Sequence, residues 1–213
     1  MISRLLPRFC RLAVLVSLGL LIFSSLCFAS NFTATLSTNQ GSMTIYGKLY
    51  VKGNNMRQEM TIGDKKQVVI CRADKKVTWL VDHAQKCYTE VPGAYSERTM
   101  RDSLKKMADE KYLGKETISG YSCKKYKYTM REKNAGTVIQ WRSDKLDWPL
   151  KTEVKREGQS MLIEYKNIKE AKPANSLFEL PKGYKKKTFG AKDKLPLKPA
   201  KPKASSTEKQ PRK

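Results

Sequence analysis

The chain has 213 residues and is strongly basic, with 43 Lys and Arg against 20 Asp and Glu and a formal net charge of +23. This length is enough for one domain with a sizeable core, and the charge favours acidic partners such as an anionic membrane surface or another acidic envelope component. Phe189 is the only aromatic residue after position 184, so the basic end lacks the interleaved aromatics of a nucleic-acid groove. We therefore expect no nucleic-acid partner.

The first 29 residues have the pattern of a secretory signal. Basic side chains come first, at Arg4, Arg8 and Arg11. An apolar stretch over 12–23 follows, and Ala29 precedes the predicted cleavage site before Ser30. The stretch is shorter than the roughly 20 residues that cross a bilayer. The pattern predicts cleavage between Ala29 and Ser30 and export to the periplasm.

Three cysteines follow this signal, at positions 71, 87 and 123. In an oxidising compartment we expect one disulfide and one free thiol, with any of the three pairings among Cys71, Cys87 and Cys123 open. The spacing contains no Cys-x-x-Cys unit, so neither zinc nor redox chemistry is predicted. We expect no metal and no cofactor.

Apolar and polar residues alternate with period two between turn signals, which predicts β-strands. Six strands fall within about 60 residues, and their short connections require an antiparallel meander. Five more strands are predicted beyond residue 110. The predicted strands cover 32–36, 43–52, 56–62, 67–72, 77–81, 86–91, 111–118, 122–131, 136–143, 150–156 and 160–168.

One helix is predicted between the two groups of strands, over 96–109. Its apolar residues, Met100, Leu104 and Met107, recur at spacings of four and three, and Ser96 is a candidate N-cap. After residue 184 the composition becomes rich in Lys and Pro and poor in apolar residues. The sequence therefore predicts a folded domain over 30–184 and a disordered tail over 185–213.

Many antiparallel strands with one amphipathic helix predict a curled sheet whose inner side the helix covers. Methionine is prominent among the predicted inward residues, and its flexible thioether suits either a lipid tail or an ordinary core gap. The candidate cavity residues are Met43, Ile45, Leu49, Met56, Met60, Ile62, Trp79, Met100, Leu104, Met107, Trp141 and Met161.

Four segments resemble proteins related to the outer-membrane lipoprotein carrier LolA, namely 47–60, 74–79, 120–126 and 175–184. The resemblance extends over about 32–184 and is to an uncharacterised bacterial branch of that superfamily. It implies a mainly β fold, an unclosed antiparallel barrel of about eleven strands with a helical lid over an apolar cavity. It also implies release of lipoproteins to a partner and an arginine within the cavity that governs lid closure, to which no position of this sequence is assigned.

No catalytic motif stands out. His83 is the only histidine, and it falls in a predicted solvated turn. The carboxylates are scattered without a predicted pair, and no phosphate loop or HExxH motif is present. We expect a non-enzymatic periplasmic protein that binds a lipid or acylated ligand. The alternative is a cell-envelope scaffold that binds anionic components through its basic surface and tail.

Overall fold

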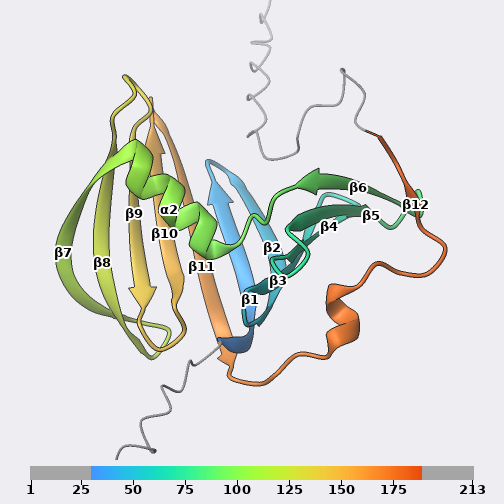
Figure 1. Ribbon diagram of the computed structural model, residues 1–213. Helices are drawn as coiled ribbons and strands as arrows, with labels where there is room; N and C mark the ends of the chain where they lie inside the picture. Colours follow the sequence, from blue (N-terminus) through green and yellow to red (C-terminus); the bar gives the residue numbers. More distant parts are fainter. Residues whose placement is uncertain (1–29, 189–213) are drawn as a thin grey trace, which may run out of the picture.

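The computed structural model describes residues 30–188, which form one open sheet with a single α-helix and one 3-10 turn (Figure 1). The strands are β1 (Asn31–Gln40), β2 (Met43–Lys52), β3 (Asn55–Ile62), β4 (Lys65–Arg72), β5 (Val77–Asp82), β6 (Cys87–Pro92), β7 (Ala108–Ile118), β8 (Tyr121–Met130), β9 (Thr137–Ser143), β10 (Trp148–Arg156), β11 (Gln159–Lys169) and β12 (Lys185–Lys186). The helix α2 spans Glu97–Met107 and the 3-10 helix η1 spans Asn175–Phe178.

The order of the strands explains the position of the helix. The chain meanders outward from β1 to β6, continues at the far edge with β7, and meanders back to β11, which pairs with β1. Because β6 and β7 lie toward opposite edges, the connection between them has to cross the sheet. Helix α2 makes this crossing, and in Figure 1 it lies in front of β9, β10 and β11. Ser96 caps its first turn by accepting a hydrogen bond from the backbone N–H of Thr99.

The predicted fold class is confirmed: the described chain is mainly β, its sheet is not closed into a barrel, and it carries one α-helix. The described chain continues past the predicted domain end at Tyr184. Lys185 and Lys186 pair in parallel with β6, and the backbone N–H of Lys187 donates to the carbonyl of Tyr88 at 2.8 Å. The short strand β12 thus lies beyond the predicted boundary at 184. The predicted signal over 1–29, with Ala29, and most of the predicted tail lie outside the described residues.

The two faces of the sheet carry different coverings. Directly paired residues of antiparallel strands project to the same face, so the strand register assigns each side chain to a face. We call the face that α2 crosses the helix face; Arg142 and Leu49 lie on it. We call the opposite face the strap face, because the C-terminal segment 175–184 lies on it; Ile70 and Trp79 belong to it.

Two apolar clusters lie in different halves of the sheet. The larger cluster is centred on β1, β2 and β9–β11 and contains Phe32, Leu49 and Leu150, each fully buried. Phe32 and Tyr165 meet the ring of Trp148 edge-on, with centroids 5.8 and 6.2 Å away. The second cluster lies on the strap face of β4 and β5, where Phe178 of η1 is buried. Each half of the sheet thus has its own core.

Candidate functional site

Helix α2 is held to the sheet by charged groups rather than by apolar packing. The Glu97 carboxylate, buried in the first turn, accepts a hydrogen bond from Nη1 of Arg142 on β9. Arg101, one turn later, donates to Oδ1 of Asp147 at 2.7 Å. Burial raises the pKa of the Glu97 carboxyl, and the guanidinium of Arg142 acts in the opposite direction. Arg142 is therefore the arginine that ties the crossing helix to the sheet.

The two methionines of α2 do not pack on the sheet, which is the contact that was predicted for them. Met100 is 52% exposed and Met107 is 50% exposed, whereas Leu104 is half-buried. With 3.6 residues per turn, these methionines project about a quarter turn away from Glu97 and Arg101. The expectation that Met100, Leu104 and Met107 together form the docked side of the lid is wrong, because the charged pairs take that place.

The cavity beneath α2 is polar and small. It has a volume of about 310 Å³ and is lined by Arg101, Lys105, Glu110, Tyr126 and Tyr128, among others. Tyr128 is 1% exposed, and burial raises the pKa of its hydroxyl. The predicted apolar cavity under the helix is therefore not found at this end of the sheet.

An apolar cavity does exist on the helix face of the other half. Its volume is about 640 Å³, and it lies where β3 turns into β4 and β5 turns into β6. Ile62, which is 41% exposed, and Leu80 supply apolar surface, and both lie on the helix face by register. Gln67 and Thr89 line the same cavity from the neighbouring strands.

Most of the predicted cavity residues on strands lie on the helix face. Residues at the strand centres are buried or half-buried there, whereas Met43 and Ile62 at the strand ends are exposed. The strand register places on this face Met43, Ile45, Leu49, Met56, Met60, Ile62 and Met161. Of these, Ile62 lines the apolar cavity, and Met56 and Met60 pack against the larger core cluster.

The two predicted tryptophans lie on the opposite face. Trp79 packs with Phe178 on the strap face, and its indole N–H donates to Glu90 at 3.0 Å. Trp141 alternates with Gln140 and Arg142 and so also points away from α2; the ammonium groups of Lys125 and Lys151 each lie 4.7 Å from its ring. Trp79 therefore does not share a cavity with Leu49, because β5 presents it in the other phase of the alternation. Trp141 is in the other phase of β9, but it belongs to the larger core cluster together with Leu49.

The strap face holds the C-terminal segment through two buried arginines. Arg57 donates to the carbonyl of Leu177 at 3.0 Å, and Arg72 donates to the carbonyl of Phe178 at 3.1 Å. Arg72 also pairs with Asp74, and this hydrogen-bonded pair lowers the pKa of the Asp74 carboxyl to about 2. The segment is thus anchored by hydrogen bonds to its backbone as well as by Phe178.

His83 is not the solvated turn residue that was predicted. Its Nδ1 lies 2.7 Å from the hydroxyl oxygen of Tyr184, and the two rings meet edge-on. Its Nε2 is buried and has no hydrogen-bond partner among the described residues. Burial lowers the pKa of His83.

The three cysteines remain free thiols in the structure. Cys71 on β4 and Cys87 on β6 are separated by β5, where they pair with Thr78 and Asp82 respectively. Two strand spacings amount to about 9 to 10 Å, which exceeds the Cα separation of a disulfide. Cys123 lies on β8, in the other half of the sheet. The expected disulfide is therefore not formed, because the fold keeps the thiols apart.

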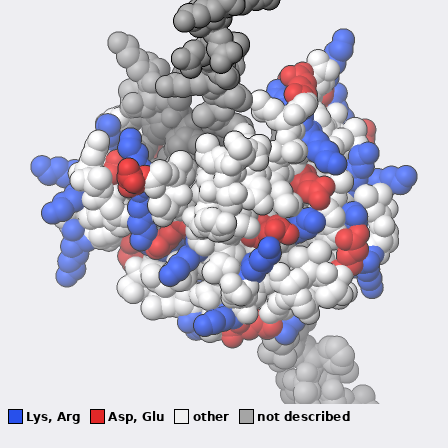
Figure 2. Space-filling model, turned by 180° about the vertical axis from the view of Figure 1, so that it is seen from behind, with Lys and Arg blue, Asp and Glu red and all other residues white. Residues whose placement is uncertain are grey.

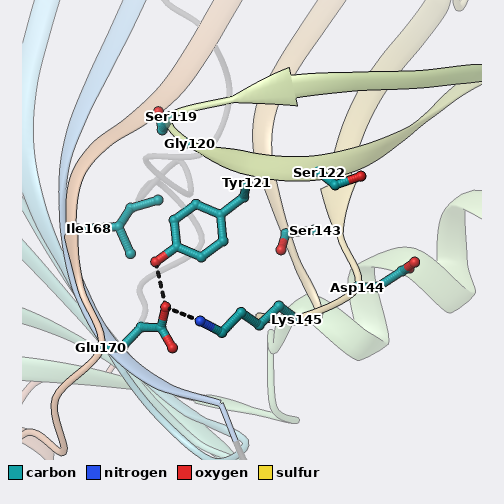
Figure 3. A pocket seen from close by; sticks show the side chains of 9 residues that line it. All are labelled: Ser119, Gly120, Tyr121, Ser122, Ser143, Asp144, Lys145, Ile168 and Glu170. Carbon is teal, nitrogen blue, oxygen red and sulfur yellow. Dashed lines mark hydrogen bonds and ion pairs between the residues drawn. The ribbon is translucent and has the colours of Figure 1, made fainter.

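A second large pocket, of about 650 Å³, is polar and lies among the turns after β7, β9 and β11 (Figure 3). Tyr121 and Lys145 both donate to the same oxygen of Glu170, at 2.8 and 2.6 Å. Burial and Glu170 raise the pKa of Tyr121 to about 12. The hydroxyl of Ser119 donates to the carbonyl of Tyr165. These groups are bound to one another, so the pocket presents a clamp between turns rather than an arrangement of nucleophile and base.

On the one face that Figure 2 shows, charge is spread rather than gathered. On the face seen in Figure 2, Lys and Arg side chains alternate with Asp and Glu. Lys124 pairs with Asp144 at 2.9 Å, for example, and Lys186 pairs with Glu90 at 2.6 Å.

Over residues 30–188, no helix has the length and apolar character needed to cross a membrane. The same residues contain no group of three or more His, Cys, Asp or Glu side chains that could hold a metal ion.

Solved structures with the same fold come from bacterial proteins. An uncharacterised conserved protein from Thermus thermophilus is 12% identical, with 76% of this chain and 92% of that chain covered and a TM-score of 0.56. A chain of the MucA/MucB complex of Pseudomonas aeruginosa is 16% identical, with 70% of this chain covered and a TM-score of 0.50; the match spans 55% of that chain, about half its length. A LolA superfamily protein from Nitrosomonas europaea is 10% identical, covers 71% and 90% of the two chains, and has a TM-score of 0.38. A LolA superfamily protein is thus among the structures similar to this chain, as the sequence predicted, and at these identities the likeness concerns the fold alone.

Sequence comparison gives the family. The search among curated proteins found no match. The model of a domain of unknown function, DUF4412, matches residues 28–147. Since this match covers more than half of the sequence, the chain belongs to the DUF4412 family.

Proposed function

We propose that this protein is an exported, non-enzymatic binding protein that holds an acyl chain on the helix face of its sheet. The observation that carries the proposal is the 640 Å³ cavity, whose apolar surface comes from Ile62 and Leu80 on that face. Its volume lies within the range of about 300–1,000 Å³ that is typical of small-molecule sites. The secretory pattern of residues 1–29 supports placement in the periplasm.

The helix presents a second exposed apolar surface, over the other half of the sheet from this cavity. Met100 and Met107 are half exposed, and unbranched thioether side chains adapt to irregular apolar partners. The helix is held by the Glu97–Arg142 and Arg101–Asp147 pairs, so changing these contacts would free the cover without disrupting an apolar core. In this proposal Arg142 has the lid-holding role that the resemblance to LolA implies.

The test is uptake of a lipid. Native mass spectrometry of the protein from a bacterial envelope fraction should show co-purified lipid, and the delipidated protein should take up a fluorescent fatty acid. Ile62→Ser should weaken this uptake, since it places a hydroxyl in the cavity. Tyr46→Ser is the matched control, because Tyr46 is 69% exposed but lies on the strap face. Met100→Gln with Met107→Gln should leave uptake by this cavity unchanged, because neither methionine lines it.

The result also decides between the two functions considered from the sequence. If the wild-type protein takes up no fatty acid while α2 is docked, the cavity is not an acyl site and the scaffold function replaces it. If Tyr46→Ser reduces uptake as much as Ile62→Ser, the probe binds elsewhere on the surface.

A further inference from the structure

The apolar cavity on the helix face has positive charge on its rim. Lys65 and Lys187 line it together with Ile62 and Leu80. Lys65 pairs with Ile62 across the turn between β3 and β4, so both project to the helix face. Lys187 follows β12 and falls in the same phase as Lys185, which pairs with Cys87. The two lysines therefore border the cavity from different strands and on the same face.

Neither lysine is neutralised within the described part of the chain. Lys65 and Lys187 form no ion pair there, whereas the neighbouring Lys66 and Lys186 are paired with Glu59 and Glu90. Two acidic residues also line the cavity, Asp64 and Asp82. Oδ1 of Asp82 already accepts hydrogen bonds from the backbone N–H groups of Ala84 and Gln85, at 2.9 and 3.1 Å. The two free ammonium groups thus remain available to a ligand.

We propose that the ligand of this cavity is an anionic amphiphile, with its acyl chain on Ile62 and Leu80 and its acidic head group at the lysine-bearing rim. The proposal rests on the proposed acyl-binding function and adds the charge of the head group. A carboxylate or phosphate meets positive charge at Lys65 or Lys187, whereas an amine meets repulsion. The rim thus selects ligands by the charge of the head group, and the cavity accepts any acyl chain that fits.

Three probes with the same chain and different head groups test this: oleate, oleyl alcohol and oleylamine. Isothermal titration calorimetry of the delipidated protein at low salt should give the order oleate, then alcohol, then amine. Exposed ion pairs are worth about 0.2–1 kcal/mol each, so two of them predict an advantage of about two- to thirtyfold for oleate over the alcohol. Added salt should reduce this advantage, because salt screens exposed charges.

Variants locate the charge. Lys65→Gln with Lys187→Gln should bring oleate to the affinity of oleyl alcohol and leave the alcohol unchanged. The matched control is Lys115→Gln with Lys133→Gln, which removes two exposed lysines that do not line the cavity. It should leave the preference for oleate intact.

The outcomes separate the two proposals. Equal binding of all three probes by the wild-type protein would overturn the anionic head group and leave acyl binding in place. An oleate preference that the control variant removes equally would assign it to the overall basic charge and would also overturn this proposal. Absence of binding by every probe would overturn acyl binding itself.

Discussion

The two halves of the sheet are each covered by one short helical element, but on opposite faces and by different chemistry. Helix α2 covers the helix face of β8 and β9 mainly through Glu97–Arg142 and Arg101–Asp147. The segment around η1 covers the strap face of β4 and β5 by burying Phe178 to 2% exposure. A cover that buries an aromatic ring contributes to the core, even though Arg57 and Arg72 also bind the strap. A cover held mainly by charged pairs can be released by changing those pairs without exposing a core residue. The difference indicates which cover is structural and which one can move.

The largest expected effect comes from the apolar cover. Phe178→Ala should lower the free energy of unfolding by about 3–5 kcal/mol, because it removes a buried aromatic ring and leaves a cavity. Urea unfolding followed by tryptophan fluorescence measures the change. Tyr46→Ala, at an exposed aromatic residue, should stay within about 0.5 kcal/mol of the wild type. A loss below about 1 kcal/mol for Phe178→Ala would show that the strap is not part of the core.

Breaking the charged contacts of α2 should lower both the local stability of the helix and the free energy of unfolding of the domain. Glu97→Ala leaves the guanidinium of Arg142 buried beside Asp147, whose Oδ1 is 3.6 Å from it. Removing one partner of a buried pair costs about 3–5 kcal/mol, and because Asp147 remains we expect about 2–3 kcal/mol. Amide hydrogen exchange should become faster over Glu97–Met107 while β4 and β5 stay protected.

Asp102→Ala is the control for this variant, because Asp102 is exposed on the same helix and forms no ion pair among residues 30–188. It should leave both the exchange and the unfolding free energy close to the wild type. If Glu97→Ala accelerates exchange equally in β4 and β5, the two covers are not independent and the comparison between the halves fails.

The sequence located the strands and the helix but did not show how α2 is attached to the sheet, and the reason is physical. Period-two alternation and turn residues are local signals, so the eleven strands and the helix with its Ser96 cap could be located from them. Which face an alternation presents depends on pairing with distant strands, so Trp79 and Trp141 were placed on the wrong side. The docking of α2 was missed because a single Glu97 in a charged helix carries no sign that Arg142, 45 residues away, will bury it.

The cavity was harder still to predict. Ile62 was among the predicted residues, but Lys187 reaches the same rim as Lys65 only because β12 adds to the edge of β6. A two-residue parallel strand has no sequence signal of its own. The methionine stripe of α2 gave the opposite error: its spacing indicates a helix correctly but does not show that the stripe stays exposed.

The strap should also respond to pH through His83. Burial lowers the pKa of His83, so the folded protein binds a proton there less readily than the unfolded chain. The unfolding free energy should therefore be greatest above the unperturbed value of about 6.5 and fall as the pH drops below it. The charged and hydroxyl groups around His83 are those of Arg57, Lys66, Glu59, Asp82 and Tyr184.

Urea titrations from pH 7.5 to 5.5 measure this dependence, and His83→Asn should flatten it. Carboxyls with lowered pKa values, such as those of Glu59 and Asp74, lose their contribution at lower pH, below about 4.5. They fall outside this window and serve as an internal reference. An unchanged slope in His83→Asn would show that the histidine contributes nothing to the attachment of the strap.

The smallest effect is expected where the sequence predicted a large one. Met100→Gln with Met107→Gln should change the free energy of unfolding by less than about 1 kcal/mol, since both side chains are half exposed and Gln has a helix propensity close to that of Met. The same urea unfolding measures it, with Phe178→Ala as the reference for a buried apolar contact. A loss of about 2–5 kcal/mol per residue would mean that the stripe is packed as a core. A stable variant that has lost fatty-acid uptake would show instead that α2 presents its methionines to a ligand, while its charged side holds it on the sheet.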